Sequence, residues 1–527
     1  MQLSTVCTAL SLPLTWATPQ FSSKHGNCTV GQIVKTSSGP IAGHAAAKYP
    51  EVSEYLGIPY AQPPVGNLRF AAPVKYAGSS LVNGSAFGSS CPKPPSQNIT
   101  PSPDLIAASN VTAIGLELFN LIGNPDVVYS EDCLFLNVWS KPQSGERKKA
   151  VMVYVHGGAF SGGTSSTPIF NGATLAERED VIIVTLNYRV SILGFPGNPT
   201  AQNNVGFLDQ RLAMEWVRDN IANFGGDPAR ITLFGQSAGG SSVDYYAYAW
   251  ASDPIVAGII AQSGTTISFG LPYPESVSAA AWYSVSAAVG CGDSSTDSTA
   301  LLACMRNVEH DSLLKSVPSD GLNALFSAFG PTVDNTIVFS NYSQQTAASI
   351  PMLLGSADYE SGVLRTQLAL ANTTFVDSDW DEANLAGYTC PAGIRANASI
   401  AANNPTWRYR YHGVFPNTNI SWQGGAYHGA ELTLLFGTTF ATPSSTPEEI
   451  EFETYIQGAW AAFAKDPVHG LTTYEGGWPL YDPAKESLVR LAYDNLVGTN
   501  LAFPEIYDAG CVNASLPALL CRIFGLC

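Results

Sequence analysis

The stretch that decides the fold reads Ile231-Thr232-Leu233-Phe234-Gly235-Gln236-Ser237-Ala238-Gly239-Gly240. Its first four residues form an apolar run that predicts a buried strand, and the rest matches the pattern G-x-S-x-G. Directly after a strand, this pattern predicts a sharp turn into a helix that holds Ser237 in a strained backbone conformation. The glycines two residues before and after the serine leave the room that such a turn needs. A glycine-rich turn with a passive serine remains the alternative.

Four further apolar runs predict the rest of a sheet. They lack polar alternation, which is typical of parallel strands covered on both faces, and they are Ala150–Val155, Val181–Leu186, Ile255–Ala261 and Pro351–Gly355. Residues Leu208–Phe224 carry apolar side chains every three or four positions, which predicts a helix with one buried stripe. Gly225-Gly226-Asp227-Pro228 is expected to end that helix. This strand–helix–strand order predicts an α/β fold with a central, mostly parallel twisted sheet flanked by helices.

The composition is that of a folded, acidic protein. Of 527 residues, 45% are hydrophobic and only 13% are charged, which excludes intrinsic disorder. The 25 basic and 42 acidic residues give a net charge of −17, so nucleic acid is not an expected partner. No repeat and no long linker divides the chain. We therefore expect residues 18–527 to form one domain with large insertions.

The N-terminal segment predicts secretion. Residues 3–16 are mostly apolar and lead into Ala17, so residues 1–17 are expected to be a signal peptide that is removed. No later stretch reaches the ~18 apolar residues that a membrane span requires, and an extracellular, soluble protein is expected. Removal of Cys7 leaves nine cysteines, so at least one is free or pairs elsewhere. None forms a CxxC pair, which favours disulfides over a metal site.

A second glycine-rich loop adds candidate chemistry. Ala150–Val155 runs into His156-Gly157-Gly158-Ala159-Phe160, where small residues allow backbone N–H groups to approach an anion. An H-G-G loop upstream of G-x-S-x-G is the arrangement of lipases and esterases, in which the serine is the nucleophile. The helix after Ser237 adds the N–H of Ala238 at its positive end. We interpret His156 as a loop-orienting residue rather than a catalytic one.

The sequence resembles the type-B carboxylesterase/lipase family, α/β-hydrolases that include cholinesterases and some fungal lipases. Matching segments run in order along most of the chain: Tyr55–Ala61, Leu68–Phe70, Ser130–Leu134, Leu136–Val138, His156–Phe160, Asn187–Arg189, Leu208–Arg211, Phe224–Pro228, the Ser237 turn, Trp460, Phe463-Ala464 and Asp466-Pro467. The resemblance implies an α/β-hydrolase fold with large insertions. It also implies a secreted fungal-type carboxylesterase that needs no metal or organic cofactor.

The resemblance assigns further residues. In the family the oxyanion donors are the second and third small residues of the H-G-G loop and the residue after the serine, which implies Gly158, Ala159 and Ala238. It pairs Cys91 with Cys133 and Cys291 with Cys304. The pairing of the other mature cysteines stays open, and these are Cys28, Cys390, Cys511, Cys521 and Cys527.

The other members of a catalytic triad are expected later in the chain, acid before base. His428 is the candidate base, because His428-Gly429-Ala430-Glu431-Leu432 resembles the family's H-G-x-E-L segment. The family places its acid five residues after the glycine that ends the Pro351–Gly355 strand, which implies Glu360. The usual E-G pair is interrupted here by Ser361, so Asp358 remains an alternative.

Three functions follow from these residues. The leading hypothesis is a Ser-His-Glu esterase that forms an acyl-enzyme from a small-molecule or lipid ester. The alternative is a lipase or sterol esterase whose lid lies between Cys91 and Cys133, where Leu105-Ile106 and Ile114–Ile122 are apolar. The sequons at Asn98 and Asn110 make a glycosylated rim the other interpretation of that loop. A non-catalytic adhesion-type homologue is least expected, because the candidate nucleophile and base are present. Choline esters are poor candidates, because Gln236 replaces the glutamate that cholinesterases carry before the nucleophile.

Overall fold

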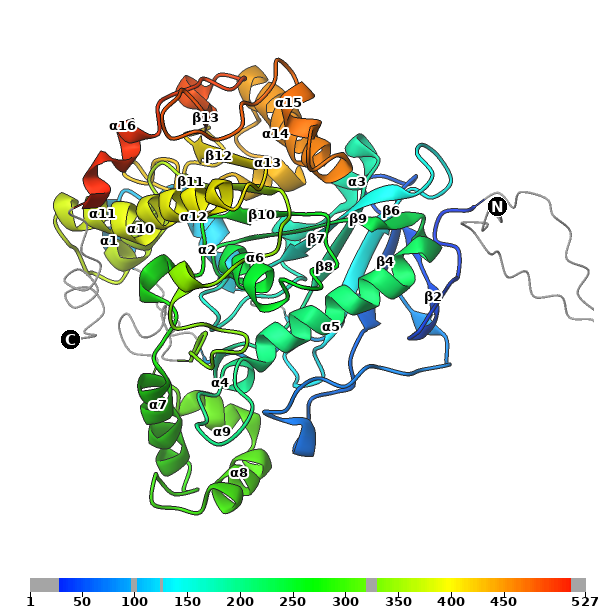
Figure 1. Cartoon of the computed structure of the whole chain (residues 1–527), viewed down its shortest axis with the longest axis vertical. Coiled ribbons are helices and arrows are strands. Elements are labelled where there is room, and N and C mark those ends of the chain that lie inside the picture. The colour runs from blue at the N-terminus through cyan, green and yellow to red at the C-terminus, as the bar shows by residue number, and fades with distance from the viewer. Residues whose placement is uncertain (1–27, 96–101, 124–126, 319–328, 513–527) are drawn as a thin grey trace, which may run out of the picture.

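The computed structural model describes residues 28–95, 102–123, 127–318 and 329–512. The expected signal peptide, Asn98, Cys521 and Cys527 lie outside these ranges. Within them, ten strands form the central sheet in the order β13-β12-β11-β10-β9-β7-β8-β6-β4-β3 (Figure 1). The strands are β3 (His44–Ala45), β4 (Ser53–Pro59), β6 (Phe135–Ser140), β7 (Lys149–Val155), β8 (Ile182–Leu186), β9 (Gly226–Gln236), β10 (Gly258–Gln262), β11 (Met352–Ala357), β12 (Thr406–Tyr411) and β13 (Leu488–Leu491).

The sheet is parallel from β8 to β13 and antiparallel at the edge formed by β6, β4 and β3. A small separate sheet joins β1 (Val34–Thr36), β2 (Gly39–Ala42) and β5 (Val82–Asn83). The five predicted apolar runs correspond to β7, β8, β9, β10 and β11. The expectation of an α/β fold with a mostly parallel sheet is confirmed.

Helices cover both faces of the sheet. In β7, Val151, Val153 and Val155 belong to one core and Met152 and Tyr154 to the other, because successive side chains of a strand point to opposite faces. The first core is closed by α5 (Val205–Asn220) and α6 (Ala238–Ala249), and the second by α3 (Ala173–Glu179), α13 (Leu432–Phe436) and α14 (Pro447–Lys465). Burial on both sides explains why the strands read as unbroken apolar runs.

The predicted helix Leu208–Phe224 is α5 followed by a 3-10 turn at Ile221–Phe224. Gly225, with φ +93°, ends that turn as expected. Gly226, Asp227 and Pro228 were expected to form a turn before the next strand, but β9 already begins at Gly226. Lys149 pairs with Gly226 and Val151 with Ile231, so the extra residues of β9 form an irregularity between the two pairs.

Some of the remaining helices also contribute side chains to these two cores, and others pack elsewhere. Helices α7 (Glu275–Ala288), α8 (Ser298–Asn307) and α9 (His310–Lys315) gather at one end of the molecule around a separate core (Figure 1). The other helices are α1 (Pro103–Ala108), α2 (Ala113–Gly123), α4 (Ser191–Gly194), α10 (Gly362–Leu370), α11 (Asp377–Asn384), α12 (Cys390–Ala401), α15 (Gly470–Thr473) and α16 (Glu505–Asp508). No helix of the described residues is long and apolar enough to cross a membrane.

The structure forms both disulfides that the resemblance implied, Cys91–Cys133 and Cys291–Cys304. The first closes the base of the segment that carries α1 and α2, which we call the entrance hairpin (residues 91–133). A third disulfide joins Cys390 to Cys511, and Cys28 is also disulfide-bonded. The described part of the chain has no free cysteine.

Candidate active site

Ser237 occupies the turn between β9 and α6 in a backbone conformation that non-glycine residues avoid. Its φ is +62° and its ψ is −126°. The turn is tight, because a methyl group added at Gly239 would lie 2.0 Å from the carbonyl oxygen of Val155. The N–H of Ser237 donates to the carbonyl oxygen of Gln262 on β10 at 2.8 Å. The sheet therefore fixes Ser237 at its carboxyl edge, where open α/β sheets bind ligands.

The H-G-G loop lies against this turn. A methyl group added at Gly157 would come within 2.9 Å of Cβ of Ser237. Gly158, Ala159 and Phe160 all have positive φ, at +115°, +53° and +58°. A side chain at position 158 would lie 2.4 Å from the carbonyl oxygen of Gly162. Within the described chain, the N–H groups of Gly158, Ala159 and Ala238 donate to no protein acceptor and remain available to a ligand.

The side chain of His156 packs beneath its own H-G-G loop, in the protein interior. Its side chain is buried and stacks on Tyr188, with ring centroids 4.5 Å apart and an interplanar angle of 19°. Its Nδ1 contacts the carbonyl oxygen of Gly157 at 2.8 Å. Burial lowers the pKa of this imidazole to about 4, so it is neutral at ordinary pH. The surroundings match a residue that orients the loop.

Glu360 and His428 form a short side-chain contact. Oε2 of Glu360 lies 2.5 Å from Nδ1 of His428. The other carboxylate oxygen accepts the N–H of Ala357 at 2.6 Å, and the N–H of His428 donates to the carbonyl oxygen of Glu360 at 3.3 Å. The Tyr388 ring, whose centroid is 5.1 Å away, packs beside the imidazole. Because Glu360 holds Nδ1, the imidazole has a fixed orientation with Nε2 as its remaining polar atom.

Asp358, the alternative acid, has different partners. Its Oδ1 accepts from Nε of Arg410 at 2.7 Å and lies 3.5 Å from Nδ1 of His412. Burial opposes ionisation of this carboxyl group, but the hydrogen bond from His412 and the charge of Arg410 outweigh it and lower the pKa to about 2. The structure thus places Glu360, rather than Asp358, beside His428.

The segments that carry His428 and Ser237 pack against each other. A methyl group added at Gly429 would lie 3.4 Å from Nε2 of Gln236. The residue after the candidate base thus faces the residue before the candidate nucleophile. Strands β9 and β11 are separated only by β10, so Ser237 and Glu360 lie at the same edge of the sheet.

A second buried carboxyl group, which the sequence analysis did not single out, adjoins this pair. Glu431 is 1% exposed, and its Oε1 accepts from Nε2 of Gln262 at 2.9 Å. Oε2 has no hydrogen-bond partner among the described residues. Burial, together with the charge of Glu360, raises the pKa of Glu431 to about 7. Its position three residues after His428 is the one sequence signal that could have identified it.

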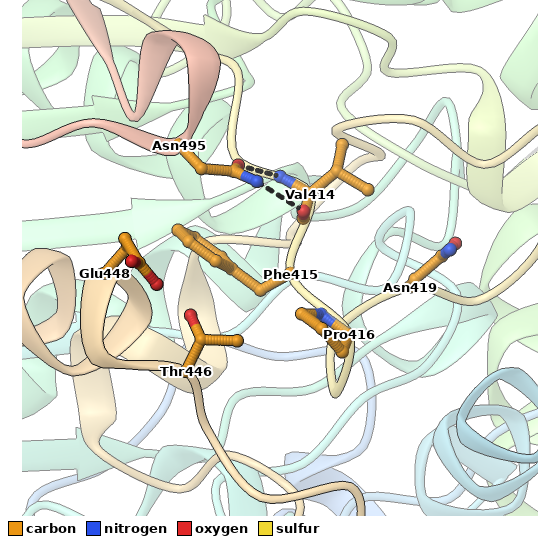
Figure 2. Close-up of a pocket in the computed structure, with 7 residues that line it drawn as sticks. All are labelled: Val414, Phe415, Pro416, Asn419, Thr446, Glu448 and Asn495. Atoms are coloured by element: carbon orange, nitrogen blue, oxygen red, sulfur yellow. Dashed lines mark hydrogen bonds between the residues drawn. The ribbon is translucent and has the colours of Figure 1, made fainter.

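The described residues contain no cluster of histidine, cysteine and acidic side chains that could hold a metal ion. A cavity of about 390 Å³ opens beside the N-terminus of α14. Figure 2 shows the side chains that line it. It is lined by Val414, Phe415, Pro416, Asn419, Thr446, Glu448 and Asn495, and Asn495 holds the Val414 backbone through two hydrogen bonds. Ser237, Glu360 and His428 do not line it, so the cavity is separate from the candidate active site.

Comparison with known proteins identifies relatives of this chain. Residues 30–386 match the sequence model of the Carboxylesterase family. The chain is 37% identical to the chlorogenic acid esterase of Aspergillus niger over 87% of both chains. It is 34% identical to secreted lipase 5 of Gibberella zeae over 92% of this chain and 94% of that protein. It is 37% identical to the cholinesterase of Mus musculus over 57% of this chain and 48% of that protein.

The fold and these relatives define a carboxylic ester hydrolase of the α/β-hydrolase class. The chain belongs to the carboxylesterase family, as the resemblance predicted.

Proposed function

We propose that the chain is a secreted serine esterase whose catalytic triad is Ser237, His428 and Glu360. The observation that carries this proposal is the 2.5 Å contact between Glu360 and His428 beside the strained turn of Ser237. A buried carboxylate on Nδ1 leaves Nε2 free to accept a proton, which is the role of the base in such triads. The family supports the class of reaction, and the contact supports these particular residues.

The mechanism has two halves. His428 accepts the proton of the Ser237 hydroxyl, and Oγ attacks the ester carbonyl carbon. The N–H groups of Gly158, Ala159 and Ala238 stabilise the oxyanion, each by roughly 10²–10³ in rate. Cleavage of the ester bond releases the alcohol, which takes its proton from His428. A water molecule, deprotonated by His428, then attacks the acyl-enzyme, and the carboxylic acid leaves as Ser237 regains its proton.

Glu360 acts through His428. Its carboxylate fixes the imidazole tautomer and stabilises the imidazolium that forms in each half-reaction, without itself taking the proton. The backbone N–H of Ala357 holds the second carboxylate oxygen, which keeps the acid in place.

The proposal includes export. Residues 1–17 would serve as a signal peptide, and residues 18–527 would be the mature, single-domain enzyme. The disulfides Cys91–Cys133, Cys291–Cys304 and Cys390–Cys511 suit an oxidising compartment, and one relative is named a secreted lipase.

The test is the loss of the nucleophile. Ser237→Ala should lower kcat on 4-nitrophenyl butyrate by at least about 10⁴, while its circular dichroism and melting temperature stay close to those of the wild type. A fluorophosphonate probe should label the wild type at Ser237 and leave the variant unlabelled. Undiminished turnover by the variant, or labelling at another residue, would refute the proposed triad.

A lipase with an interfacial lid is the second candidate. Helix α2 of the entrance hairpin buries Ile114 and Leu118, and Thr112 donates from its N–H to the carbonyl oxygen of Ile420 at 2.9 Å. Ile122 at the end of the same helix is 44% exposed. Turnover of acyl esters from C2 to C16, measured below and above the onset of emulsion, separates the candidates. A rise in rate at the emulsion boundary would favour the lipase.

A further inference from the structure

Lys93 belongs to the entrance hairpin and packs against the loop that carries Gly158 and Ala159. It follows the Cys91–Cys133 disulfide by two residues and is half-buried. A methyl group added at Gly162 would lie 3.2 Å from Cδ of Lys93, so the lysine stem crosses this loop. The N–H of Gly162 in turn donates to the carbonyl oxygen of Gly158 at 3.0 Å. The lysine therefore packs on the same short loop that carries two of the proposed oxyanion donors.

The charge of Lys93 is not neutralised by the described residues. Its Nζ donates to the carbonyl oxygen of Gly123 at 3.3 Å and lies 5.8 Å from the centroid of the Tyr129 ring. It forms no ion pair with a described carboxylate, and burial alone lowers the pKa of its ammonium group. An anionic ligand therefore stabilises a half-buried cation of this kind by more free energy than it would stabilise a fully solvated cation.

Neighbouring basic residues are different, because each already has an acidic partner. Arg69 pairs with Glu131 of the entrance hairpin, and Arg189 pairs with the buried Asp209. Neither guanidinium group is free to take a charge from a substrate. Lys93 is the basic residue at the oxyanion loop that retains this capacity in the described part of the chain.

We propose that Lys93 binds a carboxylate carried by the substrate, and that the enzyme accordingly prefers esters bearing an acidic group. This inference rests on the proposed function, because it places the anion beside the reacting ester. Because the net charge of −17 disfavours the approach of anionic substrates, a local cation would favour their binding. Lys93 would be a specificity-determining residue and would leave the chemical step to Ser237 and His428.

Chlorogenic acid and its methyl ester are a suitable pair of probes, because they differ only in whether the carboxylate is free. For Lys93→Met, KM for chlorogenic acid should rise about tenfold more than KM for the methyl ester, the ratio expected from one charged contact. Lys93→Arg should restore most of the preference. Lys35→Met, which removes an exposed charge on β1, is the matched control and should change neither KM.

Salt provides an independent readout. Raising the ionic strength should raise KM for chlorogenic acid with the wild type and have less effect with Lys93→Met.

Three outcomes would contradict the inference or the function beneath it. If Lys93→Met changed KM equally for both esters, or changed neither, Lys93 would have only a structural role and the inference would be overturned. A wild type that cleaves 4-nitrophenyl butyrate but shows no preference for the free acid would also overturn it. In that case the proposed triad would stand. A wild type inactive on all three esters would refute the proposed function itself.

Discussion

The sheet edge that carries the proposed triad and the entrance hairpin are built in opposite ways. At the edge, Ser237 and Glu360 follow buried strands, and each is held by at least two short contacts. The hairpin instead carries two short helices, and Val128 on its return segment is 72% exposed. The proposed catalytic residues thus lie where packing over-determines geometry, whereas the hairpin, which we propose borders the entrance, can change at small cost in stability. Related enzymes can therefore share a reaction and differ in substrate.

After the loss of the nucleophile itself, the largest expected effect contrasts the two carboxylates that follow β11. Glu360→Gln should lower kcat by about 10³–10⁴, because the imidazole loses its tautomer and its counter-charge. Asp358→Asn should change kcat by only a few-fold, because its carboxylate is bound by Arg410 and His412. Steady-state kinetics on 4-nitrophenyl butyrate measures both. A larger loss in Asp358→Asn than in Glu360→Gln would exchange the two roles.

The next effect concerns the oxyanion loop. Gly158→Ala should lower kcat by about 10²–10³, since the added methyl group would collide with the carbonyl oxygen of Gly162 and displace the donors. KM should change much less than kcat, because the donors bind the transition state more strongly than the substrate. Ser161→Ala removes the hydroxyl that donates to the carbonyl oxygen of Gly158 at 3.1 Å but creates no collision, and it should lower kcat much less. Near-normal kcat in Gly158→Ala would show that the loop is not the oxyanion site.

A third prediction concerns pH and the buried Glu431. The pKa of its carboxyl group is raised to about 7 in the folded protein, above the 4.5 of an exposed glutamate. The folded state therefore holds an extra proton between these values, and its stability falls as pH rises through them, by roughly 3 kcal/mol. Glu431→Gln should remove this loss and be more stable than the wild type at pH 8 but not at pH 4. Urea unfolding at both values measures this, and a pH-independent difference would contradict it.

The smallest expected effects come from shortening one valine in the sheet and one in the entrance hairpin. Val153→Ala in β7 should lower the free energy of unfolding by about 2 kcal/mol, because the side chain is fully buried. Val128→Ala in the entrance hairpin should change it by no more than about 0.5 kcal/mol. Denaturant titration of both variants measures the contrast. Equal losses would show that the hairpin is packed as firmly as the sheet.

Fully buried parallel strands were the part of the fold most accessible from sequence. The run Val181–Leu186, for example, contains one polar residue, Thr185, so its apolar pattern indicates burial on both faces. Strand β12 was not predicted, because Arg408 and Arg410 interrupt its apolar pattern. Both arginines are buried through ion pairs with Asp508 and Asp358, which lie elsewhere in the chain. Local patterns contain no information on such distant partners.

The same limit applies to the candidate site. Motifs pointed to Ser237 and His428, and the family position favoured Glu360. Asp358 stayed an alternative, because the path of the chain after β11 decides which carboxylate turns inward. Glu431 was overlooked because its unusual pKa arises from burial and from Glu360 rather than from its own neighbours in sequence. The Cys390–Cys511 pair spans 121 residues, and an odd number of cysteines left its connectivity open.

That disulfide has a consequence for an enzyme exposed to proteases. It closes a covalent ring that contains His428 and the exposed segment around Pro443 but leaves Ser237 outside. A single cut within this segment would open the chain without releasing either fragment. β12 and β13, one on each side of the cut, would also remain paired. Nicked enzyme should therefore stay whole under oxidising conditions and separate into two pieces only when unfolded in the presence of a reductant.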